Sequence, residues 1–210
     1  MKGNIVYISV MGTMGSGKTT VARLLARSLK YILLEENFGE NAFLPRFYQD
    51  MKRWAFHSQT FFLMEKISQI FNAAKLLKTN SVIQDTPIYQ DAFSYAKAQH
   101  VLGNIDDAEW RLYQKIYKSF KPYFKRPDLI IFLKTSVAGL ISRIDNRGRG
   151  YEKQIPESYI ELLDMLNNKW ISENTRIPLL SITTDDLDVV HSSTARDIVV
   201  NKVKTTLNIK

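Results

Sequence analysis

A glycine-rich segment near the N-terminus has the residue types and spacing of a phosphate-binding loop. Its residues are Gly12, Thr13, Met14, Gly15, Ser16, Gly17, Lys18 and Thr19, followed by Thr20. In such a loop the backbone N–H groups surround phosphate oxygens, the lysine reaches the β- and γ-phosphates, and the final hydroxyl binds Mg²⁺. The apolar run Ile5–Val10 precedes the loop, and a helix-forming stretch, Val21–Lys30, follows it. The sequence therefore predicts a site for ATP, with Lys18 on the phosphates and Thr19 on Mg²⁺.

Carboxylates follow two further apolar runs, where they could complete a site for phosphoryl transfer. Glu36 comes shortly after Tyr31–Leu34, and Asp85 comes directly after Ser81–Gln84. If these runs are parallel strands, both carboxylates lie at the edge where such sheets bind ligands. Phosphoryl transfer to a hydroxyl needs a base that takes its proton, a role that suits Glu36. Asp85 could hold Mg²⁺ directly or through water. An exposed loop glutamate is the alternative interpretation of Glu36.

Three arginines lie close together in the second half of the chain. They are Arg143, Arg147 and Arg149, and they follow a helical pattern with two glycines between and after them. Guanidinium groups match phosphate oxygens and stabilise the charge that develops during phosphoryl transfer. We interpret residues 143–155, approximately, as a mobile arginine-rich lid over ATP. A solvated basic loop is the alternative.

Five short apolar runs, separated by longer stretches, predict the elements that position these residues. The runs are Ile5–Val10, Tyr31–Leu34, Ser81–Gln84, Leu129–Leu133 and Leu179–Ile182. Strand–helix alternation of this kind favours an α/β fold with a mainly parallel sheet. Asp106 and Glu109 have the spacing of a capping box and predict a helix through about Phe124. Because no flexible linker interrupts the chain, we expect residues 1–210 to form one domain.

One expected helix combines an apolar stripe with two polar side chains. The stripe consists of Phe56, Leu63, Ile67, Ile70, Ala74 and Leu77. Gln59 and Lys66 lie on it or next to it, two turns apart. A buried amide without partners costs about 1–3 kcal/mol. Either the core or a ligand must therefore satisfy Gln59.

The composition excludes several kinds of chemistry and of partner. The chain has no cysteine, which excludes disulfides, thiolate metal sites and cysteine nucleophiles. It has no apolar run long enough to span a membrane and no recognisable signal peptide, so we expect a cytoplasmic protein without a membrane partner. The net charge of +8 suggests an anionic partner. We see no basic stripe interleaved with aromatics, and therefore expect no nucleic-acid partner.

Beyond the glycine loop, the chain resembles the deoxyribonucleoside kinase family, especially its bacterial deoxyadenosine/deoxyguanosine branch. The matching residues are Tyr48, Lys52–Phe56, Gln59, Asp85–Ala92, Arg143, Arg147–Arg149, Glu152, Ile155, Pro156 and Tyr159. The resemblance extends from the glycine loop to near Trp170. It implies a P-loop NTPase-type three-layer fold with a five-stranded parallel sheet, and a homodimer. It also implies ATP-dependent phosphorylation of the 5′-hydroxyl of a deoxyribonucleoside, in nucleotide salvage.

The resemblance implies which residues carry out the reaction. Glu36 would be the general base for the 5′-hydroxyl. Lys18, Arg143, Arg147 and Arg149 would stabilise the charge of the transferring phosphoryl group. The ATP site would comprise residues 12–20 with Arg147 and Arg149, and Thr19 and Asp85 would hold Mg²⁺.

The resemblance also implies a set of substrate-binding residues, namely Glu36, Tyr48, Trp54, Gln59, Lys66, Asp91 and Glu152. Tyr48 and Glu152 would hold the 3′-hydroxyl. Gln59 would pair with the edge of the base, and Trp54 would line the base pocket. Asp91 would help to read the base, with Lys66 in the place of its usual arginine partner. The pair of Gln59 and Asp91 favours a purine, or cytosine, over thymine, and we favour deoxyadenosine or deoxyguanosine.

Departures from the family pattern, such as the two that follow, bear mainly on base specificity, and three alternative functions stay open. Thr86 stands where the family has arginine, and Lys66 lacks the two-pronged geometry of arginine. One alternative is a nucleoside monophosphate kinase, such as a thymidylate kinase. Another is a catalytically silent relative with a structural or regulatory role. A nucleic-acid-stimulated ATPase is the third.

Overall fold

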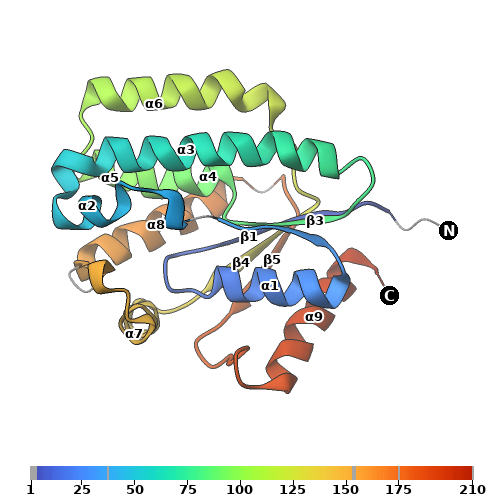
Figure 1. Ribbon diagram of the computed structural model, residues 1–210. Helices are drawn as coiled ribbons and strands as arrows, with labels where there is room; N and C mark the ends of the chain where they lie inside the picture. Colours follow the sequence, from blue (N-terminus) through green and yellow to red (C-terminus); the bar gives the residue numbers. More distant parts are fainter. Residues whose placement is uncertain (1–3, 37, 153–154, 175, 210) are drawn as a thin grey trace.

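Five parallel strands form the centre of the molecule (Figure 1). The computed structural model describes residues 4–36, 38–152, 155–174 and 176–209, so residues 153–154 of the expected lid lie outside the described part. The strands are β1 (Tyr7–Gly12), β2 (Ile32–Leu34), β3 (Val82–Asp85), β4 (Leu129–Lys134) and β5 (Leu179–Thr183). Their order in the sheet is β2-β3-β1-β4-β5. This arrangement confirms the predicted parallel α/β fold, and every predicted strand lies within two residues of an observed one.

Helices cover both faces of the sheet because alternate side chains of each strand point to opposite sides. Ile8 and Val10 of β1 pack in a core with α1 (Lys18–Leu29) and α9 (Ser193–Leu207). Tyr7 and Met11 face the other way, where α3 (Met51–Leu76) and α8 (Glu157–Glu173) supply the partners. Figure 1 shows α1 and α9 on one side of the sheet and α3 on the other. Three layers result, as the family resemblance implies.

Short helical elements surround the edge of the sheet where the strands end. They are η1 (Phe38–Glu40), α2 (Leu44–Gln49), α4 (Ile88–Gln90), the π-helical η2 (Asp91–Ala96), α5 (Lys97–Val101), α7 (Val137–Arg147) and η4 (Gly150–Glu152). π-helical turns occur often at functional sites. In the described part of the chain, no helix has the length and apolar character needed to cross a membrane.

The helix α6 (Asp107–Phe120) lies outside α3, as Figure 1 shows. Its N-terminus carries the predicted capping box, in which Asp106 accepts from the backbone N–H of Glu109 and Glu109 accepts from that of Asp106. The predicted end at Phe124 is wrong. The α-helix stops at Phe120 and continues as a 3₁₀ turn, η3 (Lys121–Tyr123), because Pro122 has no N–H to donate to the preceding turn.

Candidate active site

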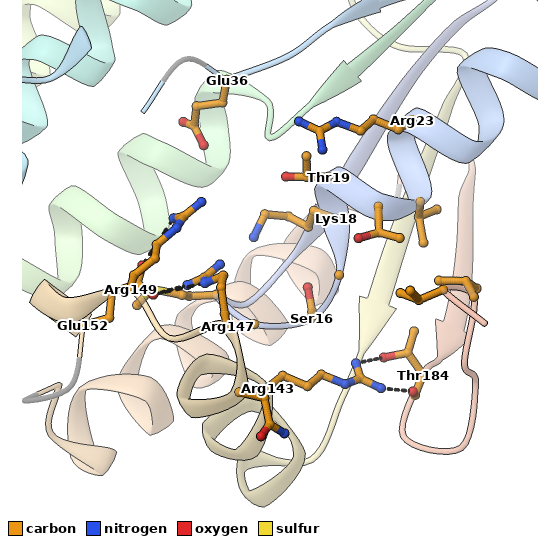
Figure 2. Close-up of a pocket in the computed structure, with 18 of the residues that line it drawn as sticks. Ser16, Lys18, Thr19, Arg23, Glu36, Arg143, Arg147, Arg149, Glu152 and Thr184 are labelled. Carbon is orange, nitrogen blue, oxygen red and sulfur yellow. Dashed lines mark hydrogen bonds and ion pairs between the residues drawn. The ribbon is translucent and has the colours of Figure 1, made fainter. Parts of the chain in front are cut away.

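The carboxyl ends of the strands open into a cavity of about 1250 Å³. Of the residues predicted for the site, those that line the cavity are Met14, Gly15, Ser16, Gly17, Lys18, Thr19, Thr20, Glu36, Tyr48, Gln59, Asp91, Arg143, Arg147, Arg149 and Glu152. They come from sequence positions more than 130 residues apart, and Figure 2 shows several of them around one space. The remaining predicted residues, Gly12, Thr13, Trp54, Lys66 and Asp85, are not part of the lining.

The glycine loop has a backbone that requires its glycines. Gly15 has φ +87°, and a β-carbon there would lie 2.8 Å from the carbonyl oxygen of Leu140. Gly17 has φ +93°, a left-handed conformation that disfavours any residue with a β-carbon. Gly12 and Thr13 do not line the cavity, but their hydrogen bonds fix the start of the loop to neighbouring elements. The Gln90 amide binds the backbone of Gly12, and the Thr13 hydroxyl donates to Asp164 at 2.9 Å.

The interior of the loop fits phosphate groups. The Ser16 hydroxyl is buried and, among the described residues, has no hydrogen-bond partner. Likewise, no described side chain caps the N-terminus of α1, so its first N–H groups and its dipole are available for an anion. Lys18 donates to the Thr13 carbonyl at 3.3 Å and projects between Glu36 and the lid arginines (Figure 2). Burial lowers the pKa of Lys18, an effect that the nearby Asp85 and Glu36 oppose.

Thr19 and Asp85 lie together below the loop, where they fit a magnesium ion. The Thr19 hydroxyl donates to Asp85 Oδ2 at 2.6 Å, which joins α1 to the end of β3. The described residues contain no cluster of three or more His, Cys, Asp or Glu side chains that could hold a metal by itself. Mg²⁺ typically uses one or two carboxylates together with substrate phosphates and water. This pair therefore has the composition expected of a magnesium site that is completed by a bound nucleotide.

Glu36 follows β2 and is almost fully buried. Its carboxylate lies 3.3 Å from Lys66 Nζ, and the side chains are 7% and 0% exposed, respectively. Burial raises the pKa of Glu36, while Lys66 and Lys18 oppose the rise and Asp85 adds to it. A raised pKa suits a general base, which acts best when its pKa is near the working pH.

Lys66 has a different partner from the one that the resemblance implies. It was expected beside Asp91, in the place of an arginine, but its ion pair is with Glu36 and its hydrogen bond is with the Asp85 carbonyl, at 3.1 Å. A lysine ammonium is a compact group on a flexible stem and does not reproduce a planar arginine fork. Lys66 therefore contacts Glu36 without lining the cavity itself.

Gln59 and Asp91 form a polar end of the cavity that is enclosed by aromatic and aliphatic side chains. Gln59 Oε1 and Asp91 Oδ2 are buried and lack hydrogen-bond partners within the described residues. Burial, followed by the nearby Glu36, raises the pKa of Asp91 well above its ordinary value. Unsatisfied buried polar atoms cost free energy, so this end of the cavity fits a ligand with polar edges. The neighbouring lining residues Leu44, Phe47, Phe62 and Tyr95 were not predicted.

Trp54, which was predicted to line the base pocket, is not among the residues that line the cavity. Its ring stacks on Phe43, with centroids 5.8 Å apart, and the Arg46 and Arg53 guanidinium groups lie over it. The reason is helical geometry, because a residue five positions before Gln59 points about 140° away from it. Phe62, three positions after Gln59, shares its face and lines the cavity instead.

Two of the three predicted lid arginines, Arg147 and Arg149, bind one carboxylate. Glu152 is 4% exposed, and it accepts from Arg147 Nε at 3.1 Å, from Arg147 Nη2 at 2.6 Å and from Arg149 Nη1 at 3.3 Å. Tyr151 stacks on Tyr48, with ring centroids 5.4 Å apart, which attaches the lid to α2. Of the two residues implied for the 3′-hydroxyl, Tyr48 thus forms this stacking contact and Glu152 directly follows its partner Tyr151.

Arg143 lies apart from the other two arginines. It donates through Nη1 to the Thr184 hydroxyl at 2.9 Å and through Nη2 to the Thr184 carbonyl (Figure 2). The expectation that all three arginines follow the helix is wrong, since α7 continues through Arg147 and ends at Gly148 in a left-handed conformation. The segment 184–191 after β5 also lines the cavity, although none of its residues is among the predicted site residues.

Comparisons with known proteins agree with this geometry. The family model described as deoxynucleoside kinase matches residues 8–208. The deoxyadenosine/deoxycytidine kinase of Bacillus subtilis is 30% identical over 96% of this chain and 93% of its own length. The deoxyguanosine kinase of the same organism is 30% identical over 93% and 90%. A structure of deoxyadenosine kinase from M. mycoides with dCMP and dCDP bound superposes with a TM-score of 0.83, at 28% identity, and covers 95% and 99% of the two chains.

The family model spans nearly the whole chain, and the fold is that of a solved relative. This chain therefore belongs to the deoxynucleoside kinase family and is a phosphotransferase.

Proposed function

We propose that the protein, acting as one domain, transfers the γ-phosphoryl group of ATP to the 5′-hydroxyl of a deoxyribonucleoside, with purines preferred. The observation that carries the proposal is the convergence of three features in one cavity. They are a phosphate loop, a buried carboxylate at Glu36, and the unsatisfied polar atoms of Gln59 and Asp91. Its relatives act on deoxyadenosine, deoxycytidine or deoxyguanosine, as their names state.

The residues would divide the work along the length of the cavity. Residues 12–20 hold the phosphates, and Thr19 and Asp85 hold Mg²⁺, which neutralises phosphate charge when bound. Glu36 accepts the proton of the 5′-hydroxyl. Lys18, Arg147 and Arg149 stabilise the negative charge that develops on the transferring group. Arg143 contributes less to this stabilisation than Arg147 and Arg149, because its guanidinium is bound to Thr184.

The end of the cavity that contains Gln59 and Asp91 suits an uncharged nucleoside, because its base has adjacent hydrogen-bond donor and acceptor atoms. Gln59 offers an acceptor and a donor from one amide, which matches the adjacent donor and acceptor of adenine or cytosine. Tyr48 and Glu152 would bind the 3′-hydroxyl. Glu152 also binds Arg147 and Arg149, so recognition of the sugar and orientation of the lid share one carboxylate.

A nucleoside monophosphate kinase is the second candidate to test. Its acceptor carries a phosphate, which a carboxylate at Glu36 would repel. The buried position of Glu36 makes this repulsion strong, because a low-dielectric site screens charges poorly. The geometry therefore favours a nucleoside over its monophosphate as acceptor.

An acceptor panel tests the proposed reaction directly. Initial rates of transfer from ATP with Mg²⁺ would be measured for the four deoxyribonucleosides and their monophosphates, with a chelator present in a parallel series. We expect transfer to at least one nucleoside, fastest with deoxyadenosine or deoxyguanosine, and loss of transfer when Mg²⁺ is removed. Transfer only to a monophosphate would contradict the proposal. Failure with every acceptor, despite ATP binding, would indicate a silent relative.

A homodimer is the proposed assembly, as the family resemblance implies. Four large apolar side chains are exposed on the outer side of α3, α6 and η3, namely Met64, Phe71, Leu112 and Tyr123. Phe71 contacts Tyr123, with ring centroids 5.7 Å apart, so at least these two form one surface. Light scattering should give twice the mass of the 24.3 kDa chain, and a double Phe71→Asp and Leu112→Asp variant should give the mass of one chain. A monomeric wild-type protein would contradict this assembly.

A further inference from the structure

We infer that Lys66 is a positioning residue that holds Glu36 in its ionised, acceptor-facing state. This inference rests on the proposed function, in which Glu36 takes the proton of the 5′-hydroxyl. Lys66 does not line the cavity, so its effect on the reaction passes through Glu36.

The first observation is the burial and bonding of the Lys66 ammonium group. Its side chain is 0% exposed, and Nζ lies 3.3 Å from Glu36 Oε1 and 3.1 Å from the backbone carbonyl of Asp85. It therefore ties α3 to the ends of two strands, β2 and β3. Lysine is almost never fully buried unless it is paired, so a specific partner is required.

The second observation is the charge around Glu36. Four other titratable groups influence it or are influenced by it. They are Lys18 on the glycine loop, Asp85 at the end of β3, and Asp91 and Tyr95 on η2. Among the described residues, the Lys66 ammonium is the cation that lies within ion-pair distance of the Glu36 carboxylate, at 3.3 Å.

The third observation concerns the neighbouring strand end. Thr86, which follows Asp85, is buried and has φ +57°, an unusual conformation for a β-branched residue. Its hydroxyl donates to Asp85 Oδ1 at 3.2 Å and supplies no charge. The Lys66 hydrogen bond to the Asp85 carbonyl supports this strained turn from the helix side. One lysine thus positions the base and the strand end that carries the metal ligand.

Removal of the Lys66 charge should change the pH dependence of the reaction. Without its cation, Glu36 becomes harder to ionise, and a base works only when it is ionised. Because burial already raises the pKa of Glu36, the loss of Lys66 moves it in the same direction. The acid limb of the rate profile therefore shifts to higher pH, and activity returns as the pH is raised. A merely structural role would lower the rate by a similar factor at every pH.

The test compares Lys66→Met with Lys66→Arg, and with Lys75→Met as the matched control on an exposed part of the same helix. Single-turnover rates would be measured from pH 5 to pH 9, and ATP affinity by titration calorimetry. We expect Lys66→Met to move the acid limb up by about one pH unit or more, which is about tenfold in rate below that limb. ATP affinity should stay within about twofold, since the glycine loop is untouched. Lys66→Arg should keep most of the wild-type profile, because it keeps the charge.

A double variant separates this inference from the assignment of Glu36 as the base. In a Glu36→Gln background, Lys66→Met should cause little further loss of rate. The double variant should melt at a higher temperature than Lys66→Met alone, because it leaves no unpaired charge buried. Wild-type rates in Glu36→Gln would overturn the role of Glu36. A slow Glu36→Gln variant with an unshifted profile in Lys66→Met would overturn only the role of Lys66. If Lys66→Met does not fold, Lys66→Gln takes its place, and an acid limb that stays at the wild-type pH in that variant would overturn the inference.

Discussion

Glu36→Gln is expected to lower the rate of phosphoryl transfer by about 10²–10⁴-fold, with ATP affinity little changed. Glutamine keeps the size of the side chain and cannot take a proton from the 5′-hydroxyl. The wild-type rate should fall as the pH falls through the pKa of Glu36, because the acid form of the carboxyl cannot act as a base. Burial raises that pKa, so the fall should begin at a higher pH than for an ordinary glutamate.

Single-turnover rates across pH for Glu36→Gln and wild type measure this effect. Glu173→Gln is the matched control, since Glu173 pairs with Lys169 on an exposed part of α8 and does not line the cavity. It should stay within about threefold of wild type, as expected for a surface ion pair. A Glu36→Gln variant with the wild-type rate and the wild-type acid limb would show that the base lies elsewhere.

Lys18→Met is expected to lower kcat/KM by at least about 10²-fold, the scale on which a positioned charge stabilises a transition state. Lys18 is the first residue of α1, directly after the glycine loop, and methionine retains the length of its side chain without its charge. Burial lowers the pKa of Lys18, but Asp85 and Glu36 counteract this, which favours the charged form.

Steady-state kinetics with the preferred nucleoside, together with ATP titration calorimetry, measure the effect of Lys18→Met. Lys202→Met on the exposed side of α9 is a control of the same chemistry far from the cavity. Transfer at the wild-type rate in Lys18→Met, with normal folding by circular dichroism, would contradict the assignment of the loop as the site of the transferred phosphoryl group.

The sequence alone determined the features that depend on local patterns. The spacing of the glycine loop predicted a turn that the structure confirms, because left-handed backbone at Gly15 and Gly17 restricts those positions to glycine. Apolar runs predicted all five strands. The central strands β1 and β4 are buried almost throughout, which requires a mostly apolar run, whereas β5 at the edge of the sheet is largely exposed. The capping box predicted the start of α6 for a similar reason, as its two hydrogen bonds form within four residues.

Only the tertiary structure decided which side chains meet. Lys66 pairs with Glu36 in preference to Asp91, and Arg143 binds Thr184 in preference to the centre of the cavity. Neither partner is encoded by spacing, because each pair joins elements that are far apart in the chain and are brought together by packing on the sheet. Trp54 shows the same limit, since a motif states which residues are present but the rotation of a helix decides which of them face the site. Local conformation follows from short-range sterics and hydrogen bonds, whereas the pairing of charges depends on the whole core.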